Sequence, residues 1–105
     1  MTDKIAILMT CKNPREAGKI ARHLLDQRLI ACANIIPQIS SVYRWKGEVK
    51  DDKELLLVVK TRQDRLAHVV QAVKELHSYT VPETIALPIT GGSEAYLAWL
   101  REETP

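Results

Sequence analysis

Near the middle of this 105-residue chain stands an aliphatic row, Leu55-Leu56-Leu57-Val58-Val59. Successive side chains of a β-strand point to opposite faces of its sheet, so both faces of this segment carry aliphatic side chains. Such a row is too short for a buried helix and is typical of a strand covered on both sides. Ile5 to Met9 form a second row of this kind. We therefore expect two central strands, at residues 5–9 and 49–61.

A helix is predicted directly after the first of these strands. Asn13 supplies an N-cap side chain, Pro14 fits the first helical position, and Glu16 is the acid of a capping box. Apolar residues then recur at helical spacing, with charged residues between them, which indicates one buried stripe. The stripe consists of Ala17, Ile20, Ala21, Leu24 and Leu25.

Two more helices are predicted farther along the chain. Asp64 is expected to cap the first of them. Its apolar stripe consists of Leu66, Val69, Val70, Val73 and Leu76, and His77 lies at the end of the same stripe. The other is a short final helix that begins after Gly91-Gly92 with Ser93 as its cap. It contains Tyr96, Leu97, Trp99 and Leu100.

Two further strands contain proline, which cannot donate a hydrogen bond to a strand ladder. Residues 29–36 form an extended segment that ends at Pro37, an edge or bulge position, and the strand resumes at 42–45. Lys46-Gly47-Glu48 is predicted to turn the chain into the strand at 49–61, which makes a hairpin. Residues 84–89 form a fourth strand that contains Pro88. We expect both of these strands at the edges of the sheet.

The predicted order of elements is β-α-β-β-α-β with a trailing helix, which is the ferredoxin-like, split βαβ arrangement of an α+β protein. Right-handed crossovers place both main helices on one face of such a sheet. No linker or repeat divides residues 1–105, so we expect a single domain.

The second face of the predicted sheet is also apolar, which is unexpected for a sheet face that meets water. The trailing helix is too short to cover it, so we expect another copy of the chain to do so in a closed ring. The hairpin that carries Tyr43 and Trp45 is long enough to overrun its own sheet and pair with a neighbour. The alternative is that these two aromatic residues flank a single core.

Composition excludes several classes of protein. Hydrophobic residues make up 46% and charged residues 27% of the chain, which is typical of a globular protein. The 15 basic and 13 acidic residues nearly balance, so charge gives no reason to expect nucleic-acid binding. No apolar stretch approaches the roughly 20 residues of a membrane-spanning helix. The start of the chain lacks a signal-peptide pattern, so we expect a cytoplasmic protein whose two cysteines stay reduced.

His77 and Cys11 are the candidate metal ligands. A neutral imidazole suits copper or zinc, and a thiol is a soft ligand for Cu(I). The alternative for His77 is an imidazole stabilised by the end of its helix, and for Cys11 a buried free cysteine. Cys32 is expected to be a small core residue, and His23 and His68 to face water. No C-x-x-C pair indicates a preformed metallochaperone loop.

Lys60, Tyr79 and Glu83 are predicted to form a polar cluster, because the loop after the second long helix returns beside the end of the third strand. The cluster is either a ligand cleft or a solvated charged rim. Motifs for catalysis are absent from the sequence: it has no Gly-rich phosphate loop, nucleophile elbow or metalloprotease helix. RNA-recognition domains share this strand order, but their third strand carries aromatic side chains that stack on bases. Residues 55–59 are all aliphatic, which argues against RNA binding.

A series of motifs resembles the CutA family of divalent-cation tolerance proteins. The motifs are Ala31-Cys32-Ala33-Asn34-Ile35-Ile36-Pro37, Ser41-Val42-Tyr43-Arg44-Trp45-Lys46-Gly47, Lys60-Thr61-Arg62, Leu76-His77-Ser78-Tyr79, Val81-Pro82-Glu83, Ile85-Ala86-Leu87-Pro88-Ile89 and Tyr96-Leu97-Ala98-Trp99-Leu100. Their order covers nearly the whole chain. The chain departs from the family pattern at Ser78, where proline often follows the histidine, and at Leu76, where some members have another histidine.

The resemblance implies a ferredoxin-like subunit in a very stable homotrimer, similar to PII signalling proteins, with clefts between subunits. It implies a non-enzymatic protein that binds divalent metal, with copper as the leading candidate, and contributes to metal tolerance. Tyr43, Trp45 and Trp99 are expected at the trimer interface. Two alternatives stay open: a scaffolding trimer that assembles partner proteins and binds metal only incidentally, and a small enzyme that uses the intersubunit cleft.

Overall fold

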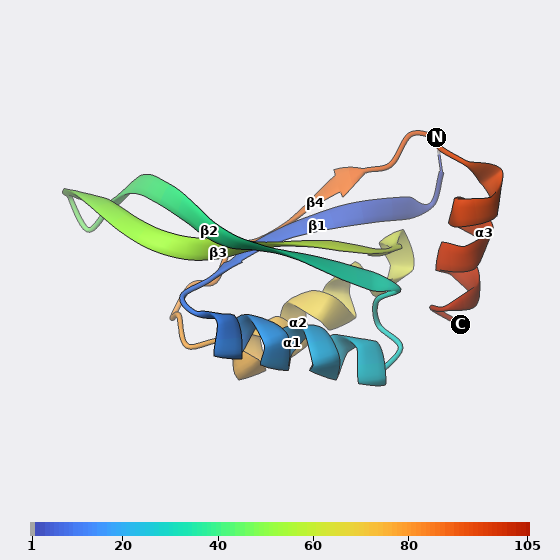
Figure 1. Ribbon diagram of the computed structural model, residues 1–105, viewed down its shortest axis with the longest axis horizontal. Helices are drawn as coiled ribbons and strands as arrows, with labels where there is room; N and C mark the ends of the chain where they lie inside the picture. Colours follow the sequence, from blue (N-terminus) through green and yellow to red (C-terminus); the bar gives the residue numbers. More distant parts are fainter. Residues whose placement is uncertain (1) are drawn as a thin grey trace.

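The structure, a computed structural model, describes residues 2–105 as one antiparallel sheet with two long helices on one face and a third helix at one end (Figure 1). The elements are β1 (Lys4–Cys11), α1 (Pro14–Asp26), β2 (Cys32–Trp45), β3 (Glu48–Arg62), a 3-10 turn (Gln63–Arg65), α2 (Leu66–Leu76), β4 (Thr84–Pro88) and α3 (Glu94–Glu102). The strand order is β2-β3-β1-β4. The ferredoxin-like fold is therefore confirmed, with β1 and β3 central and the two proline-bearing strands at the edges.

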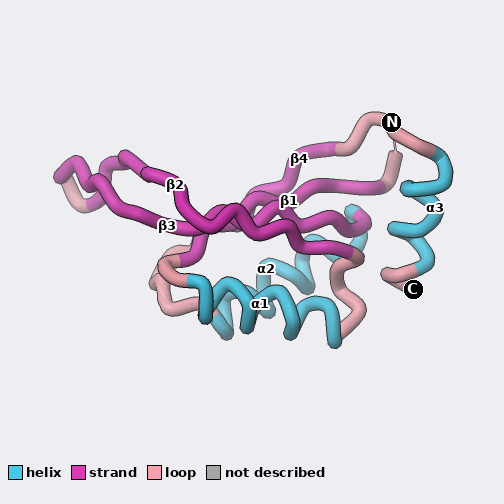
Figure 2. Tube along the Cα trace, viewed as in Figure 1, coloured by secondary structure: helices cyan, strands magenta, loops and turns pink. Residues whose placement is uncertain are grey.

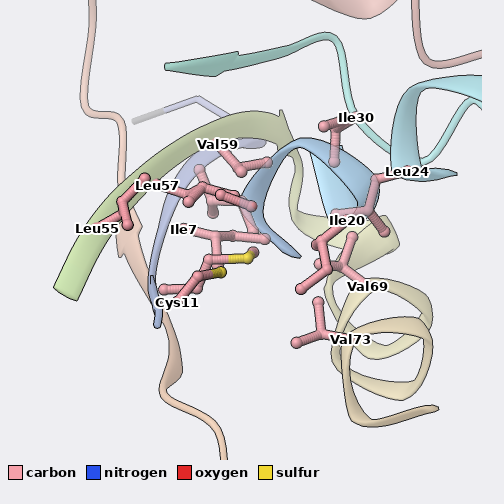
Figure 3. Packing of buried hydrophobic residues seen from close by; sticks show 13 residues of the cluster. Ile7, Cys11, Ile20, Leu24, Ile30, Leu55, Leu57, Val59, Val69 and Val73 are labelled. Carbon is pink, nitrogen blue, oxygen red and sulfur yellow. The ribbon is translucent and has the colours of Figure 1, made fainter. Parts of the chain in front are cut away.

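The core lies between the sheet and helices α1 and α2 (Figure 3). Alternate residues of the two central strands point into it and are almost fully buried: Ile5, Ile7, Met9 and Cys11 from β1, and Leu55, Leu57 and Val59 from β3. The helices contribute Ile20, Leu24, Val69 and Val73. Val70, predicted as part of the same stripe, is 40% exposed, because it lies on the outer side of α2.

The start of α1 follows the predicted cap. The Asn13 Oδ1 atom accepts a hydrogen bond of 2.8 Å from the backbone N–H of Glu16, and Pro14 occupies the first turn. The predicted cap of α2 is wrong. Asp64 lies inside the 3-10 turn, and its carboxylate forms ion pairs of 3.5 Å with Arg62 and 3.7 Å with Arg65. Ser93 caps α3 as predicted, accepting from the N–H of Tyr96.

The predicted second strand starts too early. Arg28 takes a left-handed conformation with φ of 59°, and its N–H and that of Leu29 bond back to Leu25 and Leu24. This pair of bonds is a Schellman end, which usually requires glycine. The strand therefore begins only at Cys32. At Pro37 the predicted bulge is confirmed, because the register between β2 and β3 shifts between Ile36 and Ile39.

The hairpin of β2 and β3 runs well beyond the two long helices (Figure 2). Lys46 and Gly47 both have positive φ, 49° and 81°, as expected for a tight two-residue hairpin turn. Large apolar side chains along this hairpin are exposed, with Val42 at 67% and Val49 at 63%. The hairpin thus exposes apolar side chains that this chain does not cover, set among charged ones such as Arg44, Lys50 and Asp51.

The sheet face opposite α1 and α2, which we call the open face, carries apolar side chains on all four strands, with Asn34 and Lys60 as polar residues among them. Register places these side chains on it: Ala6, Leu8, Ile36, Leu56, Val58, Ile85 and Leu87. Ile36, Ile85 and Leu87 remain 41%, 51% and 49% exposed. Helix α3 lies beyond the end of the sheet and does not cover this face (Figure 1). The predicted apolar second face is therefore present.

Candidate metal centre

Three potential metal ligands meet where β1 ends. Helices α1 and α2 run in opposite directions on the same face of the sheet, so the start of α1 lies beside the end of α2 (Figure 1). This arrangement brings together Cys11 from β1, Glu16 from the first turn of α1 and His77 from the residue after α2. One ligand atom from each of them lies within 4.8 Å of the others. Cys11 and His77 were predicted as ligands, and Glu16 was missed.

Hydrogen bonds fix the tautomer of His77. Its Nε2 atom lies 2.7 Å from the carbonyl oxygen of Thr10, which can only accept, so Nε2 carries the proton. The N–H of Tyr79 donates to Nδ1 over 3.0 Å, which requires a lone pair there. This pattern is common in metal sites, because the bond made by one ring nitrogen orients the other toward the metal.

The carboxylate of Glu16 faces the Nδ1 lone pair of His77, and no proton lies between the two atoms. Its Oε1 atom lies 3.3 Å from Nδ1 of His77. An ion pair there would need a proton on Nδ1, and the shorter bond from Tyr79 excludes one. Oε1 is buried and has no hydrogen-bond partner among residues 2–105. An unpaired buried carboxylate oxygen costs free energy, and a cation between the two atoms would remove that cost.

Cys11 completes the cluster as a protonated thiol. Burial raises the pKa of this thiol to about 12, and the negative charges of Glu16 and Glu54 act in the same direction. A cation would reverse this effect, because a coordinating thiol loses its proton. Sulfur, imidazole nitrogen and carboxylate oxygen together suit copper or zinc better than magnesium or calcium, which prefer oxygen ligands alone.

A cavity of about 700 Å³ lies next to this cluster, between the hairpin and the loop that follows α2. Tyr79 and Glu83, two of the three residues predicted for a ligand cleft, line it. The third, Lys60, does not; its Nζ atom contacts Oδ1 of Asn34 on the adjacent strand instead. Sequence reasoning missed Glu54, which also lines the cavity and accepts a 2.7 Å hydrogen bond from the Tyr79 hydroxyl.

The remaining predicted residues lie apart from the cluster. Tyr43 and Trp45 stand on the hairpin, 41% and 42% exposed, and Trp99 on α3 is 39% exposed. Cys32 was predicted to be a core residue, and this prediction is wrong: the side chain is half-buried, and its thiol lies 3.7 Å from Oδ1 of Asn34. Both His23 and His68 were predicted to face water. His68 is exposed, as predicted, whereas His23 is half-buried.

A split βαβ sandwich with a sulfur, nitrogen and oxygen cluster at the end of its central strand defines a small ferredoxin-like protein with a candidate metal centre. None of its helices, over residues 2–105, has the length and apolar character needed to cross a bilayer. The family described as CutA1 divalent ion tolerance protein matches residues 5–103.

Individual relatives agree with the family match. A divalent-cation tolerance protein CutA from Thermus thermophilus is 50% identical over 98 residues, which cover 93% of this chain and 95% of that protein. The chloroplastic CutA of Arabidopsis thaliana is 50% identical over 101 residues, but these are 95% of this chain and only 55% of the relative. A solved divalent cation tolerance protein, also from Thermus thermophilus, superposes with a TM-score of 0.95, at 48% identity over 97% of this chain and 99% of that one. The chain belongs to the CutA1 divalent ion tolerance family.

Proposed function

We propose that this protein binds a divalent transition metal at Cys11, Glu16 and His77, with copper as the leading candidate. Through this binding it would contribute to the response of the cell to metal ions. The observation that carries the proposal is the buried Oε1 atom of Glu16, which has no hydrogen-bond partner among residues 2–105 and faces a histidine lone pair. The relatives named for divalent-cation tolerance support a metal-related role.

Copper fits this donor set for chemical reasons. Among divalent first-row metals, copper has the highest affinity for a given site, and the thiol adds a ligand that Cu(I) prefers. Metal at Nδ1 would displace the Tyr79 N–H that now bonds there. We propose binding without turnover, because the sequence carries no Gly-rich phosphate loop, nucleophile elbow or metalloprotease helix. The two free cysteines also favour a reducing, cytoplasmic location.

We further propose a homotrimer of the PII-like kind. A second and a third copy would cover the open face, which otherwise exposes Ile36, Ile85 and Leu87 to water. The overhanging hairpin would pair with a neighbour, placing Tyr43 and Trp45 at the interface, and Trp99 would pack beside it. The runner-up role, a scaffold for partner proteins, would use the same assembly without a specific metal.

Metal titration of stripped protein tests the site. We expect wild-type protein to bind one Cu(II), or one Cu(I) under reductant, per chain. Cys11→Ala, Glu16→Gln and His77→Ala should each lower the affinity by about tenfold or more, because even outer-shell changes at metal sites cost that much. Isothermal titration calorimetry and equilibrium dialysis measure both affinity and stoichiometry.

Matched controls separate this site from adventitious binding. Cys32→Ala removes a thiol and His68→Ala an imidazole outside the cluster, and both should bind as wild type does. Circular dichroism and mass measurements check that every variant remains folded and assembled. Equal weak binding by all variants would exclude the site and leave the scaffolding trimer as the better proposal.

A further inference from the structure

The cavity between the hairpin and the loop after α2 is large enough for a small organic molecule. Its volume of about 700 Å³ lies within the range of small-molecule sites and greatly exceeds the space of a bare metal ion. The walls come from β1, β2, β3 and residues 78–83. They consist of Thr10, Ser41, Val42, Tyr43, Trp45, Glu54, Ser78, Tyr79, Thr80, Val81 and Glu83.

The charged side chains that line this cavity are both acidic. Among residues 2–105, Glu54 and Glu83 line it, and no lysine, arginine or histidine does. Glu54 is only 8% exposed and forms no ion pair within 4.0 Å in the same part of the chain. Glu54 also lines a second, smaller cavity of about 190 Å³ together with Lys12 and Lys53, but neither lysine forms an ion pair with its carboxylate within 4.0 Å. A largely buried carboxylate without a cationic partner is costly, so this wall favours a cation.

Aromatic side chains supply the rest of the recognition surface. Tyr43, Trp45 and Tyr79 line the same cavity, and the face of an aromatic ring attracts an organic cation. Both tyrosine hydroxyls donate to carboxylates, Tyr43 to Asp52 and Tyr79 to Glu54. Their oxygen lone pairs are therefore left to accept hydrogen bonds from a ligand N–H.

We propose that this cavity binds a small organic amine in its protonated form, with the ammonium group at Glu54 and the carbon chain against Tyr43 and Trp45. The inference does not depend on the metal site, because neither Cys11 nor Glu16 nor His77 lines the cavity. Tyr43 and Trp45 also belong to the proposed trimer interface, so a neighbouring subunit would border the mouth of the cavity. The native, assembled protein is therefore the form to test.

Calorimetric titration of metal-stripped protein with putrescine, a small diamine, tests the proposal. The wild type should bind it saturably, while 1,4-butanediol, its uncharged analogue, should bind at least about tenfold more weakly. Glu54→Gln should reduce putrescine affinity by about tenfold or more, because removing one partner of a buried charge pair typically costs that much. Trp45→Ala, on the exposed hairpin, should reduce it several-fold without touching the core.

The control removes a carboxylate that lies on the same strand but outside the cavity. Asp51→Asn on β3 should leave the affinity within about twofold of wild type, since exposed charges contribute little. Equal losses in Glu54→Gln and Asp51→Asn would reduce the effect to general attraction of cations and overturn the proposal. So would equal binding of butanediol, or the absence of saturable putrescine binding to the wild type.

Discussion

Replacing Val58 with aspartate should convert the assembled protein into single chains. Val58 lies in the middle of the open face, paired with Leu8 on β1 and Asn34 on β2. In the proposed trimer this surface is buried, so the substitution would place an unpaired charge in each of several apolar interfaces. Each buried charge costs several kcal/mol, more than a marginal interface can offset.

Static light scattering at low micromolar concentration measures the outcome. Wild type should have three times the 11.9 kDa mass of one chain, and Val58→Asp the mass of one chain, with increased binding of a hydrophobic dye. Val70→Asp is the matched control, because Val70 is 40% exposed on the outer side of α2, and its mass should stay threefold. A wild type with the mass of one chain and no dye-binding surface would contradict the trimer.

Truncating Leu57 should produce the largest loss of stability in the core. This side chain is fully buried in the core cluster, where it lies beside Ile7 on the side of the sheet that faces Ile20 and Val69 of the helices (Figure 3). Leu57→Ala should lower the free energy of unfolding by about 2–5 kcal/mol, because a rigid core cannot close the cavity that the substitution leaves.

Guanidinium unfolding measures this loss, with all variants at one protein concentration because assembly makes stability concentration-dependent. Val70→Ala, at a position 40% exposed on the outer side of α2, should change stability by less than about 1 kcal/mol. A loss for Leu57→Ala no larger than for Val70→Ala would mean that this face of β3 does not form the core.

The arrangement of the sheet was readable from a few residues. Leu55–Val59 and Ile5–Met9 are apolar on both faces, and Pro37 and Pro88 cannot stand inside a ladder, which together predict which strands are central. The ends of the elements were less readable. The Schellman end after α1 has Arg28 where glycine is usual. Asp64 lies inside a short 3-10 turn between two arginines instead of at the cap of α2, and its residue type alone does not distinguish the two positions.

The candidate site was readable in part. His77 and Cys11 stand out because few other residue types bind soft metals. Glu16 carried no such signal, because an acid in the first helical turn is explained fully by capping. Glu54 lies in the middle of β3, directly before the aliphatic row, and it is buried in the fold, where the hydroxyl of Tyr79 from the loop after α2 bonds to it. Such long-range contacts leave no local pattern in a sequence.

X-ray absorption at the copper edge of copper-loaded protein tests the proposed metal site most directly, because it reports the atoms bound to the metal. We predict a first shell that contains one sulfur, one imidazole nitrogen and one carboxylate oxygen from each chain. The sulfur should disappear in Cys11→Ala and persist in Cys32→Ala. A first shell of nitrogen and oxygen alone, unchanged by Cys11→Ala, would contradict the account.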